Sequence, residues 1–213
     1  MSGPERIGIF GGTFDPPHAG HVQVAREVVA ALELDRLLWV TAAQPPHKTM
    51  DGRTPATLRH EMVECATRDD DSFEASRLEI DRVGPSFTVD TLEDVRATAP
   101  DAEIFLIIGA DQYRQFRRWR RPERILELAR LAVMDRNGET MHDVAGEALL
   151  TGPVPLHVGR VDVSSSEIRR LGAADPWSRG VIPSSVLEVI DREGLYRGRD
   201  APERVGRLHS PES

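Results

Sequence analysis

Two histidines stand three residues apart in the segment 7–21, which reads I-G-I-F-G-G-T-F-D-P-P-H-A-G-H. Residues at this spacing share one side of a helix, so we expect His18 and His21 to point in one direction where a helix begins. The first turn of a helix offers unpaired backbone N–H groups and a partial positive charge. Gly20 between the histidines leaves room for a bulky anion. This combination favours binding of a phosphate group and stabilisation of charge that develops on it.

The elements that must position these histidines are predicted by the same segment. The apolar run 7–10, ended by Gly11 and Gly12, is typical of a short buried strand. Glycines at a strand end let a ligand approach the backbone closely. The two following prolines keep the chain extended ahead of a helix, whose apolar residues recur at three- and four-residue spacing. This arrangement is common in α/β proteins, so periodicity alone also fits histidines that are bystanders.

The full string G-G-T-F-D-P-P-H-A-G-H is more specific, and it resembles the T/H-x-G-H nucleotidyltransferase superfamily. Further motifs resemble those of the nicotinate-nucleotide adenylyltransferases within it. They are P-P-H-K at 45–48, S-F-T-V-D-T-L at 86–92, G-A-D-x-x-x-x-F-x-x-W at 109–119 and V-S-S-S-E-I-R at 163–169. The last motif departs from the family's I-S-S-T-x-I-R at Val163 and Ser166, where an apolar side chain and a hydroxyl are retained. The resemblance covers residues 7–196.

The order of short apolar runs and helical segments predicts an α/β fold with one doubly wound, mostly parallel, Rossmann-like sheet. The most apolar run, 104–108, is typical of a central strand buried on both faces. The charged run 73–80 fits an edge strand. We expect one nucleotidyltransferase domain over residues 1–196. The charged segment 197–213, with little apolar content, predicts a mobile C-terminal tail.

Composition restricts the class of protein. The net charge of −8, from 27 basic and 35 acidic residues, disfavours a general nucleic-acid or anionic-membrane surface. Cys65 is the single cysteine, so no intrachain disulfide can form, and its helical surroundings favour core packing. The chain has neither a bilayer-spanning apolar run nor a signal-peptide pattern, and we expect a cytoplasmic protein. Oligomeric state stays open, with a homo-oligomer among the options.

The resemblance implies adenylyl transfer from ATP to nicotinate mononucleotide, which yields nicotinate adenine dinucleotide and pyrophosphate in NAD biosynthesis. It implies that His18 and His21 stabilise the α-phosphate and that Arg169 holds the leaving pyrophosphate. Trp119 would stack on the pyridine ring. The implied substrate-binding residues are Gly11, Gly12, Thr13, Phe14, Lys48, Thr88, Asp111, Trp119, Ser164 and Ser165. Because no two-carboxylate metal site is visible in the sequence, we expect Mg²⁺ to arrive with ATP.

Plainer structural roles compete with several of these assignments. Ser164 followed by Glu167 is also the signature of a capped surface helix. Asp90 or Thr91 could cap a helix near the S-F-T motif. An aromatic residue at helical spacing is usually part of a core, and the arginines between 114 and 124 fit a solvated face. Arg59 fits either a phosphate partner or a surface charge.

Other functions remain open at this point. The nearest are adenylyltransferases of the same superfamily that act on nicotinamide mononucleotide or phosphopantetheine. The S-F-T-V-D-T-L and F-x-x-W segments argue against phosphopantetheine as the acceptor. The choice between nicotinate mononucleotide, which carries a carboxylate, and nicotinamide mononucleotide, which carries an amide, rests only on the resemblance. A non-catalytic nucleotide sensor would be expected to lose a histidine or the arginine of these motifs. A class I aminoacyl-tRNA synthetase fragment lacks an obvious tRNA-binding region here.

Overall fold

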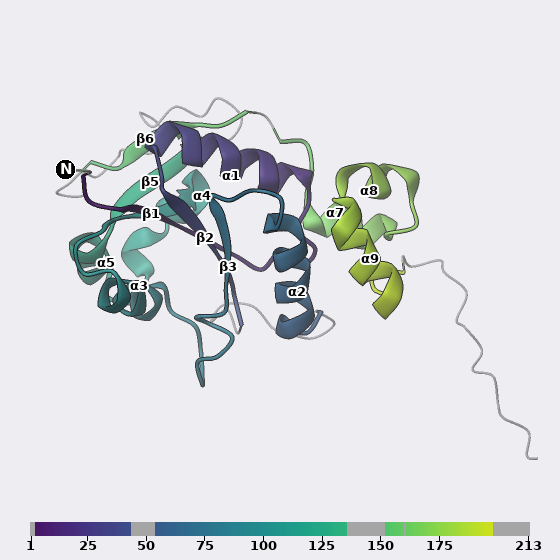
Figure 1. Cartoon of the computed structure of the whole chain (residues 1–213), viewed down its shortest axis with the longest axis horizontal. Coiled ribbons are helices and arrows are strands. Elements are labelled where there is room, and N and C mark those ends of the chain that lie inside the picture. The colour runs from purple at the N-terminus through teal and green to yellow at the C-terminus, as the bar shows by residue number, and fades with distance from the viewer. Residues whose placement is uncertain (1–2, 44–53, 136–151, 160, 198–213) are drawn as a thin grey trace, which may run out of the picture.

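Within residues 3–43, 54–135, 152–159 and 161–197, which the computed structural model describes, six parallel strands form one sheet (Figure 1). Their order is β3-β2-β1-β4-β5-β6, and every pair of neighbours is parallel. This is the doubly wound sheet that the sequence predicted. The strands are β1 (Arg6–Gly12), β2 (Arg36–Thr41), β3 (Phe73–Ser76), β4 (Glu103–Gly109), β5 (Arg130–Asp135) and β6 (Val154–His157).

The sheet is apolar on both faces because successive side chains of a strand point in opposite directions. Ile9 of β1 and Leu106 of β4 belong to the core on one face, whereas Phe10 and Phe105 belong to the core on the other. Strands covered on both faces read as continuous apolar runs. This explains the run 104–108, which is confirmed as a central strand.

Helices cover each face. The face of Phe10 is covered by α1 (Ala19–Leu32) and α2 (Ala56–Thr67). The face of Ile9 is covered by α3 (Thr88–Thr98), α4 (Ala110–Tyr113), the 3₁₀ helix η1 (Phe116–Arg118) and α5 (Pro122–Leu128). Crossovers therefore run on both sides of the sheet, as a doubly wound fold requires.

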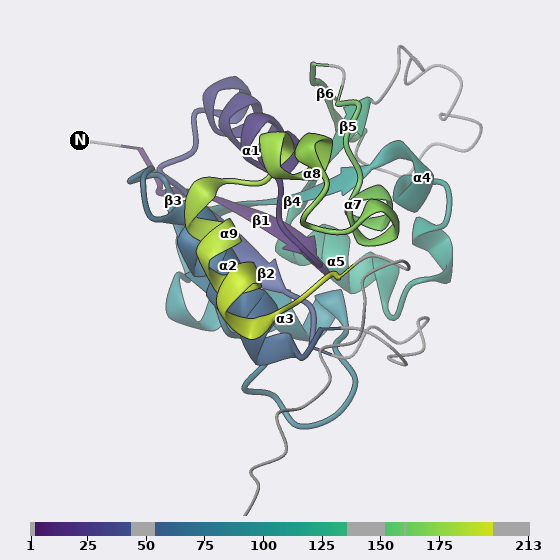
Figure 2. The ribbon, with the colours of Figure 1, turned by 90° about the vertical axis from the view of Figure 1, so that its right-hand side faces the viewer.

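A group of three short helices flanks α2: α7 (Ser165–Leu171), α8 (Pro176–Val181) and α9 (Ser184–Glu193). Figure 2 shows α9 lying along α2. Their apolar residues form a separate small core with Met62 and Cys65 of α2, which confirms the packing role expected for the cysteine. Gly194 ends α9 in the left-handed conformation, which is typical of a glycine at a helix C-cap.

Some local predictions were wrong. The strand predicted at 73–80 ends at Ser76, although its edge position is confirmed. Helix α3 begins at Thr88 with Phe87 as its N-cap, so Asp90 and Thr91 lie inside it and cap nothing. The segment 113–119, whose aromatic residues stand at helical spacing, forms the end of α4 and the turn η1.

Helix α8 was not predicted at all. Asp175 caps it by accepting hydrogen bonds from the backbone N–H groups of Trp177 and Ser178. Lys48 and residues 198–213 lie outside the described residues. No helix in the described ranges is both long and apolar enough to cross a bilayer.

Candidate active site

The loop after β1 exposes backbone at the end of the strand. A Cβ added at Gly11 would meet no atom within 4 Å, so a ligand could approach here. A Cβ at Gly12 would lie 2.6 Å from the ring of Phe14, which is itself held at a φ of 49°. Glycine at position 12 is therefore needed because the Phe14 ring folds back over the strand end.

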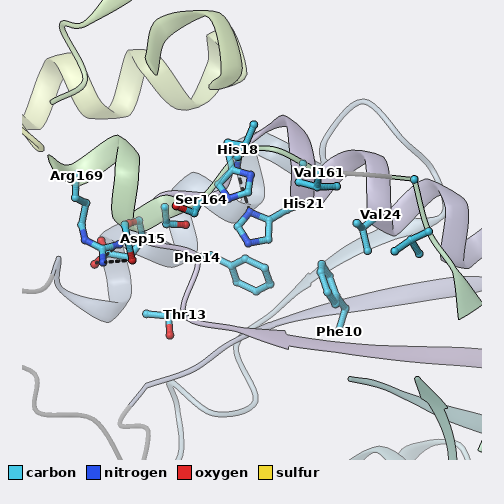
Figure 3. Close-up of a pocket in the computed structure, with 16 residues that line it drawn as sticks. Phe10, Thr13, Phe14, Asp15, His18, His21, Val24, Val161, Ser164 and Arg169 are labelled. Carbon is cyan, nitrogen blue, oxygen red and sulfur yellow. Dashed lines mark hydrogen bonds and ion pairs between the residues drawn. The ribbon is translucent and has the colours of Figure 1, made fainter. Parts of the chain in front are cut away.

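His18 and His21 lie side by side where α1 begins (Figure 3). Their ring centroids are 3.8 Å apart, which confirms the expectation that both point in one direction. The backbone N–H of His18 donates to Nδ1 of His21 over 3.2 Å. Because Nδ1 accepts this bond, a neutral His21 carries its proton on Nε2 and can donate it to an anion. The first turn of the described helix α1 has no acidic residue to oppose that anion.

Helix α7 brings a second set of hydroxyls to the same region. Ser164 is its N-cap and accepts from the backbone N–H of Glu167 over 3.2 Å, so the structural role proposed for the serine is present. Ser165 Oγ donates to the carbonyl of Pro16 over 2.8 Å. The start of α7 is thus fastened to the loop that precedes α1.

Arg169 lies one turn further along α7. Its guanidinium donates to the carbonyl of Asp15 over 2.6 Å and to Ser166 Oγ over 3.2 Å. The same group lies 4.0 Å from Oδ2 of Asp15. Because its side chain is still 31 % exposed, Arg169 keeps a charged surface on the site. Figure 3 shows it across from the two histidines.

These segments enclose a cavity of about 480 Å³. That size is typical of small-molecule sites, which span about 300–1,000 Å³. The structure therefore brings together one half of the predicted site. Its predicted members in the lining are Thr13, Phe14, His18, His21, Ser164, Ser165 and Arg169.

Further residues of the predicted site stand at the adjoining ends of β1 and β4. Strands β1 and β4 are adjacent although β2 and β3 come between them in the chain, so the sheet changes its direction of winding there. Ligands of open α/β sheets bind in the crevice at this switch point. Gly11 and Gly12 end β1, and Gly109 ends β4. A Cβ at Gly109 would lie 2.5 Å from Oδ1 of Asp111, so glycine lets this carboxylate fold over the strand end.

Thr88, Asp111 and Trp119 do not line the cavity. Thr88 is the first residue of α3, and Asp111 is exposed on α4. Trp119 is partly buried against the core, with its ring 5.5 Å from that of Phe116. The core role considered for Trp119 is thus present in part, and its exposed portion leaves a surface on which a ring could stack.

Three polar residues support the site, and the sequence analysis had considered only one of them, Arg59. Arg59 is fully buried, so its interpretation as a surface charge is wrong. Its guanidinium donates to the carbonyls of Thr13 over 2.7 Å and Thr54 over 3.0 Å. Asp15 is 1 % exposed and Tyr196 donates to its carboxylate. The sequence marks none of these contacts, because they join residues far apart in the chain.

A partly buried carboxyl group lies near the start of α3. Burial raises the pKa of Glu79 above its ordinary value, and a hydrogen bond from Thr91 opposes that rise. Thr91 Oγ1 donates to Glu79 Oε1 over 3.1 Å. Glu79 therefore ties the loop before α3 to the helix. Among the described residues, no three His, Cys, Asp or Glu side chains cluster closely enough to hold a metal ion.

Comparison with known proteins adds to this geometry. The model of the cytidylyltransferase-like family matches residues 9–171. A probable nicotinate-nucleotide adenylyltransferase of Thermus thermophilus is 44 % identical over 192 residues, which are 90 % of this chain and all of the relative. One from Saccharopolyspora erythraea is 40 % identical over 94 % of this chain and 93 % of its own. The chain belongs to the nicotinate-nucleotide adenylyltransferase family.

Solved structures of the adenylyltransferase family share the fold. The nicotinic acid mononucleotide adenylyltransferase of Plasmodium falciparum, complexed with NaAD, aligns with a TM-score of 0.75 at 18 % identity, over 90 % of this chain and 97 % of that one. A putative nicotinate-nucleotide adenylyltransferase from Vibrio parahaemolyticus gives 0.62 at 23 % identity, over 91 % and 96 %. At such identity these likenesses concern the fold alone. The family match ends at residue 171, so Tyr196 lies beyond it.

Proposed function

We propose that this protein transfers the adenylyl group of ATP to nicotinate mononucleotide, a step of NAD biosynthesis. The observation that carries the proposal is the cavity in which two adjacent imidazoles at the start of α1 face Arg169 of α7. Hydrogen-bond donors and positive charge converge there, as a polyphosphate requires. Relatives that are 44 % and 40 % identical to this chain bear the name of this activity, qualified as probable.

The reaction needs little covalent help from the protein. A phosphate oxygen of nicotinate mononucleotide attacks the α-phosphorus of ATP in line. The bond from that phosphorus to the bridging oxygen breaks, and pyrophosphate leaves with the oxygen. Because the attacking oxygen already belongs to a phosphate, no strong general base is needed. The work of the protein is to orient the two phosphates and to neutralise charge as it develops.

The phosphate roles belong to the cavity. We assign His18 and His21 to the α-phosphate, where the Nε2–H of His21 can donate to a developing charge. Arg169, with Ser164 and Ser165, holds the β- and γ-phosphates. Thr13 and Phe14, which line the cavity, surround the α-phosphate, and Gly11 and Gly12 at the end of β1 beside it provide close backbone approach. Lys48, outside the described residues, is proposed as a further phosphate contact.

The acceptor roles belong to the switch point between β1 and β4. We assign Trp119 to stacking on the pyridine ring, with Thr88 nearby at the start of α3. Asp111 at the end of β4 helps to seat the ATP side. Mg²⁺ is proposed to enter as part of the substrate, bound to the triphosphate and lowering its charge. The cytoplasm is the proposed site of the reaction.

The experiment that tests the proposal measures pyrophosphate release from MgATP by purified protein. Parallel reactions contain nicotinate mononucleotide, nicotinamide mononucleotide or phosphopantetheine, and a His18→Ala preparation is the negative control. We expect the first acceptor to be preferred strongly. A preference for another acceptor would overturn the acceptor assignment and keep the phosphate chemistry. ATP binding without release from any acceptor would instead indicate a nucleotide sensor.

A further inference from the structure

A hydrogen bond joins two residues that are 181 positions apart. The hydroxyl of Tyr196 donates to Oδ1 of Asp15 over 2.6 Å, and Thr54 Oγ1 donates to that hydroxyl over 3.0 Å. Asp15 lies in the loop between β1 and α1 and is 1 % exposed. A buried carboxylate that loses its donor carries a large desolvation cost. The position of Asp15 therefore depends on Tyr196.

The other side of Asp15 faces Arg169. Oδ2 of Asp15 accepts no hydrogen bond from any described residue, and it pairs with the Arg169 guanidinium at 4.0 Å. The carbonyl of Asp15 accepts a hydrogen bond from the same guanidinium. Asp15 thus contacts Tyr196 through one carboxylate oxygen and attracts Arg169 through the other oxygen and its backbone.

The backbone around Tyr196 is fixed as well. Tyr196 has a φ of 52°, and its carbonyl accepts from the N–H of Ala173 over 2.7 Å. Ala173 follows directly after α7, the helix that carries Arg169. Ser165 at the start of α7 is bonded to Pro16. Helix α7 is therefore fastened at both ends, by Ser165 to the loop and by Ala173 to the residue that holds Asp15.

We propose that Tyr196 is a positioning residue for ATP binding, which acts through Asp15 to hold the Arg169 guanidinium at the cavity. It touches neither substrate. The inference deepens the proposed function and rests on it only in taking ATP as the ligand of the cavity. No motif of the sequence assigned a role to this tyrosine.

Tyr196 serves as a donor and not as a base. Burial, together with the neighbouring Asp15, raises the pKa of the Tyr196 hydroxyl above its ordinary value. The hydroxyl therefore keeps its proton throughout the neutral range and continues to donate to Asp15. A role in proton transfer would predict a pH dependence of turnover that disappears in a phenylalanine variant.

The decisive variant is Tyr196→Phe in the full chain, which removes one hydroxyl and keeps the ring. We expect the Kd for MgATP, measured by calorimetry without acceptor, to rise about fivefold to tenfold, the effect that loss of one typical hydrogen bond produces. In turnover assays the KM for ATP should rise by a similar factor, whereas kcat and the KM for the acceptor stay within about twofold. Tyr113→Phe, the same change at the other tyrosine, is the matched control and should leave the Kd for ATP unchanged.

A double-mutant cycle tests the route of action. In an Arg169→Ala background, Tyr196→Phe should produce no further loss of ATP affinity, because the residue through which it acts is absent. The same fold-loss in both backgrounds would overturn the proposal and leave Tyr196 a purely structural role. An unchanged Kd for ATP in the single variant would also overturn it.

A second variant covers the case in which Tyr196→Phe does not fold. Thr54→Val removes the hydroxyl that donates to Tyr196 and keeps the shape of the side chain. We expect a loss of ATP affinity of about twofold, with an unchanged far-UV circular dichroism spectrum. Unchanged affinity there would contradict the proposal. Calorimetry keeps this test separate from the proposed function, because a wrong acceptor abolishes turnover and leaves the ATP titration intact.

Discussion

The two halves of the candidate site are built in different ways. The phosphate half, around His18 and Arg169, is held by hydrogen bonds between distant parts of the chain, as Ser165 with Pro16 shows. The acceptor half, around Trp119, rests on apolar packing and on exposed charged groups. Arg120 lies 4.4 Å from the ring centroid of Phe87, and Arg124 pairs with Glu93 at the surface.

This difference indicates where precision is required. Hydrogen bonds between buried polar groups fix geometry closely, and they cost much to break. Surface ion pairs contribute little and are screened by salt. Transfer of an adenylyl group depends on the exact line of attack, whereas stacking of a planar ring tolerates small shifts. We therefore expect changes in the phosphate half to affect kcat or ATP binding and those in the acceptor half to affect the KM for the acceptor.

The largest expected effect is at His18. His18→Ala should lower kcat about 10²-fold to 10³-fold, as loss of one transition-state donor does in other enzymes. Steady-state kinetics with saturating substrates measures this. His18→Asn, which keeps a hydrogen-bond donor, should recover part of the rate. If the alanine variant turned over at nearly the wild-type rate, His18 would have no role in the reaction, and the expected difference between the two halves of the site would be wrong.

Arg169→Ala should have the next largest effect. We expect the KM for ATP to rise about 10-fold to 30-fold, because a charged contact with the β- and γ-phosphates is lost. The matched control is Arg170→Ala, which removes the neighbouring exposed arginine that pairs with Glu167 on the surface. Equal effects of the two substitutions would mean that the cavity does not hold the triphosphate.

Trp119→Ala sharpens the comparison from the other half. We expect the KM for nicotinate mononucleotide to rise about tenfold with little change in that for ATP, since aromatic stacking on a base is worth about 1–3 kcal/mol. Trp177→Ala is the control, because Trp177 is an exposed tryptophan on α8. If both KM values rose equally, Trp119 would be a core residue only.

The smallest effect concerns stability near the acceptor half. The folded-state pKa of Glu79 is raised above the ordinary pKa of a glutamate. The stability of the fold therefore falls as pH rises from that ordinary pKa through the raised one, because Glu79 ionises less readily in the folded chain. Glu79→Gln cannot ionise, and it should raise Tm at pH 7 by about 1–3 °C. The gain should vanish in acid below that window. Thermal unfolding at several pH values measures it, with exposed Glu188→Gln as the control. A gain independent of pH would contradict this account.

Local spacing made half of the site predictable. His18 and His21 were placed correctly because both belong to one helix start that glycines and prolines mark in the sequence. The parallel sheet followed from the alternation of apolar runs and helices, with 104–108 as its central strand. The hydrogen bonds from Thr54 to Tyr196 and from Tyr196 to Asp15 could not be predicted in this way, since tertiary packing alone brings these residues together.

Burial of polar groups was the other point at which sequence was insufficient. An arginine on a helix is usually exposed, yet Arg59 is enclosed and donates to backbone carbonyls. Helix α8 was missed because its six residues, with a proline first, are too short for periodicity to register. The carbonyls that hold Arg59 come from other parts of the fold, and the start of α8 is set by a single capping residue, Asp175.

The bond between Tyr196 and Asp15 also bears on how the protein is made. A chain emerges from the ribosome from its N-terminus, so β1 and the start of α1 are synthesised before Tyr196. Tyr196, which donates a hydrogen bond to Asp15, is added to the chain 181 residues after it. At about 5–20 residues per second, this interval lasts about 9–36 seconds. A partly synthesised chain can thus form its sheet while its phosphate site stays unfinished, and under the role proposed above for Tyr196 full ATP affinity is expected only after that residue has been added.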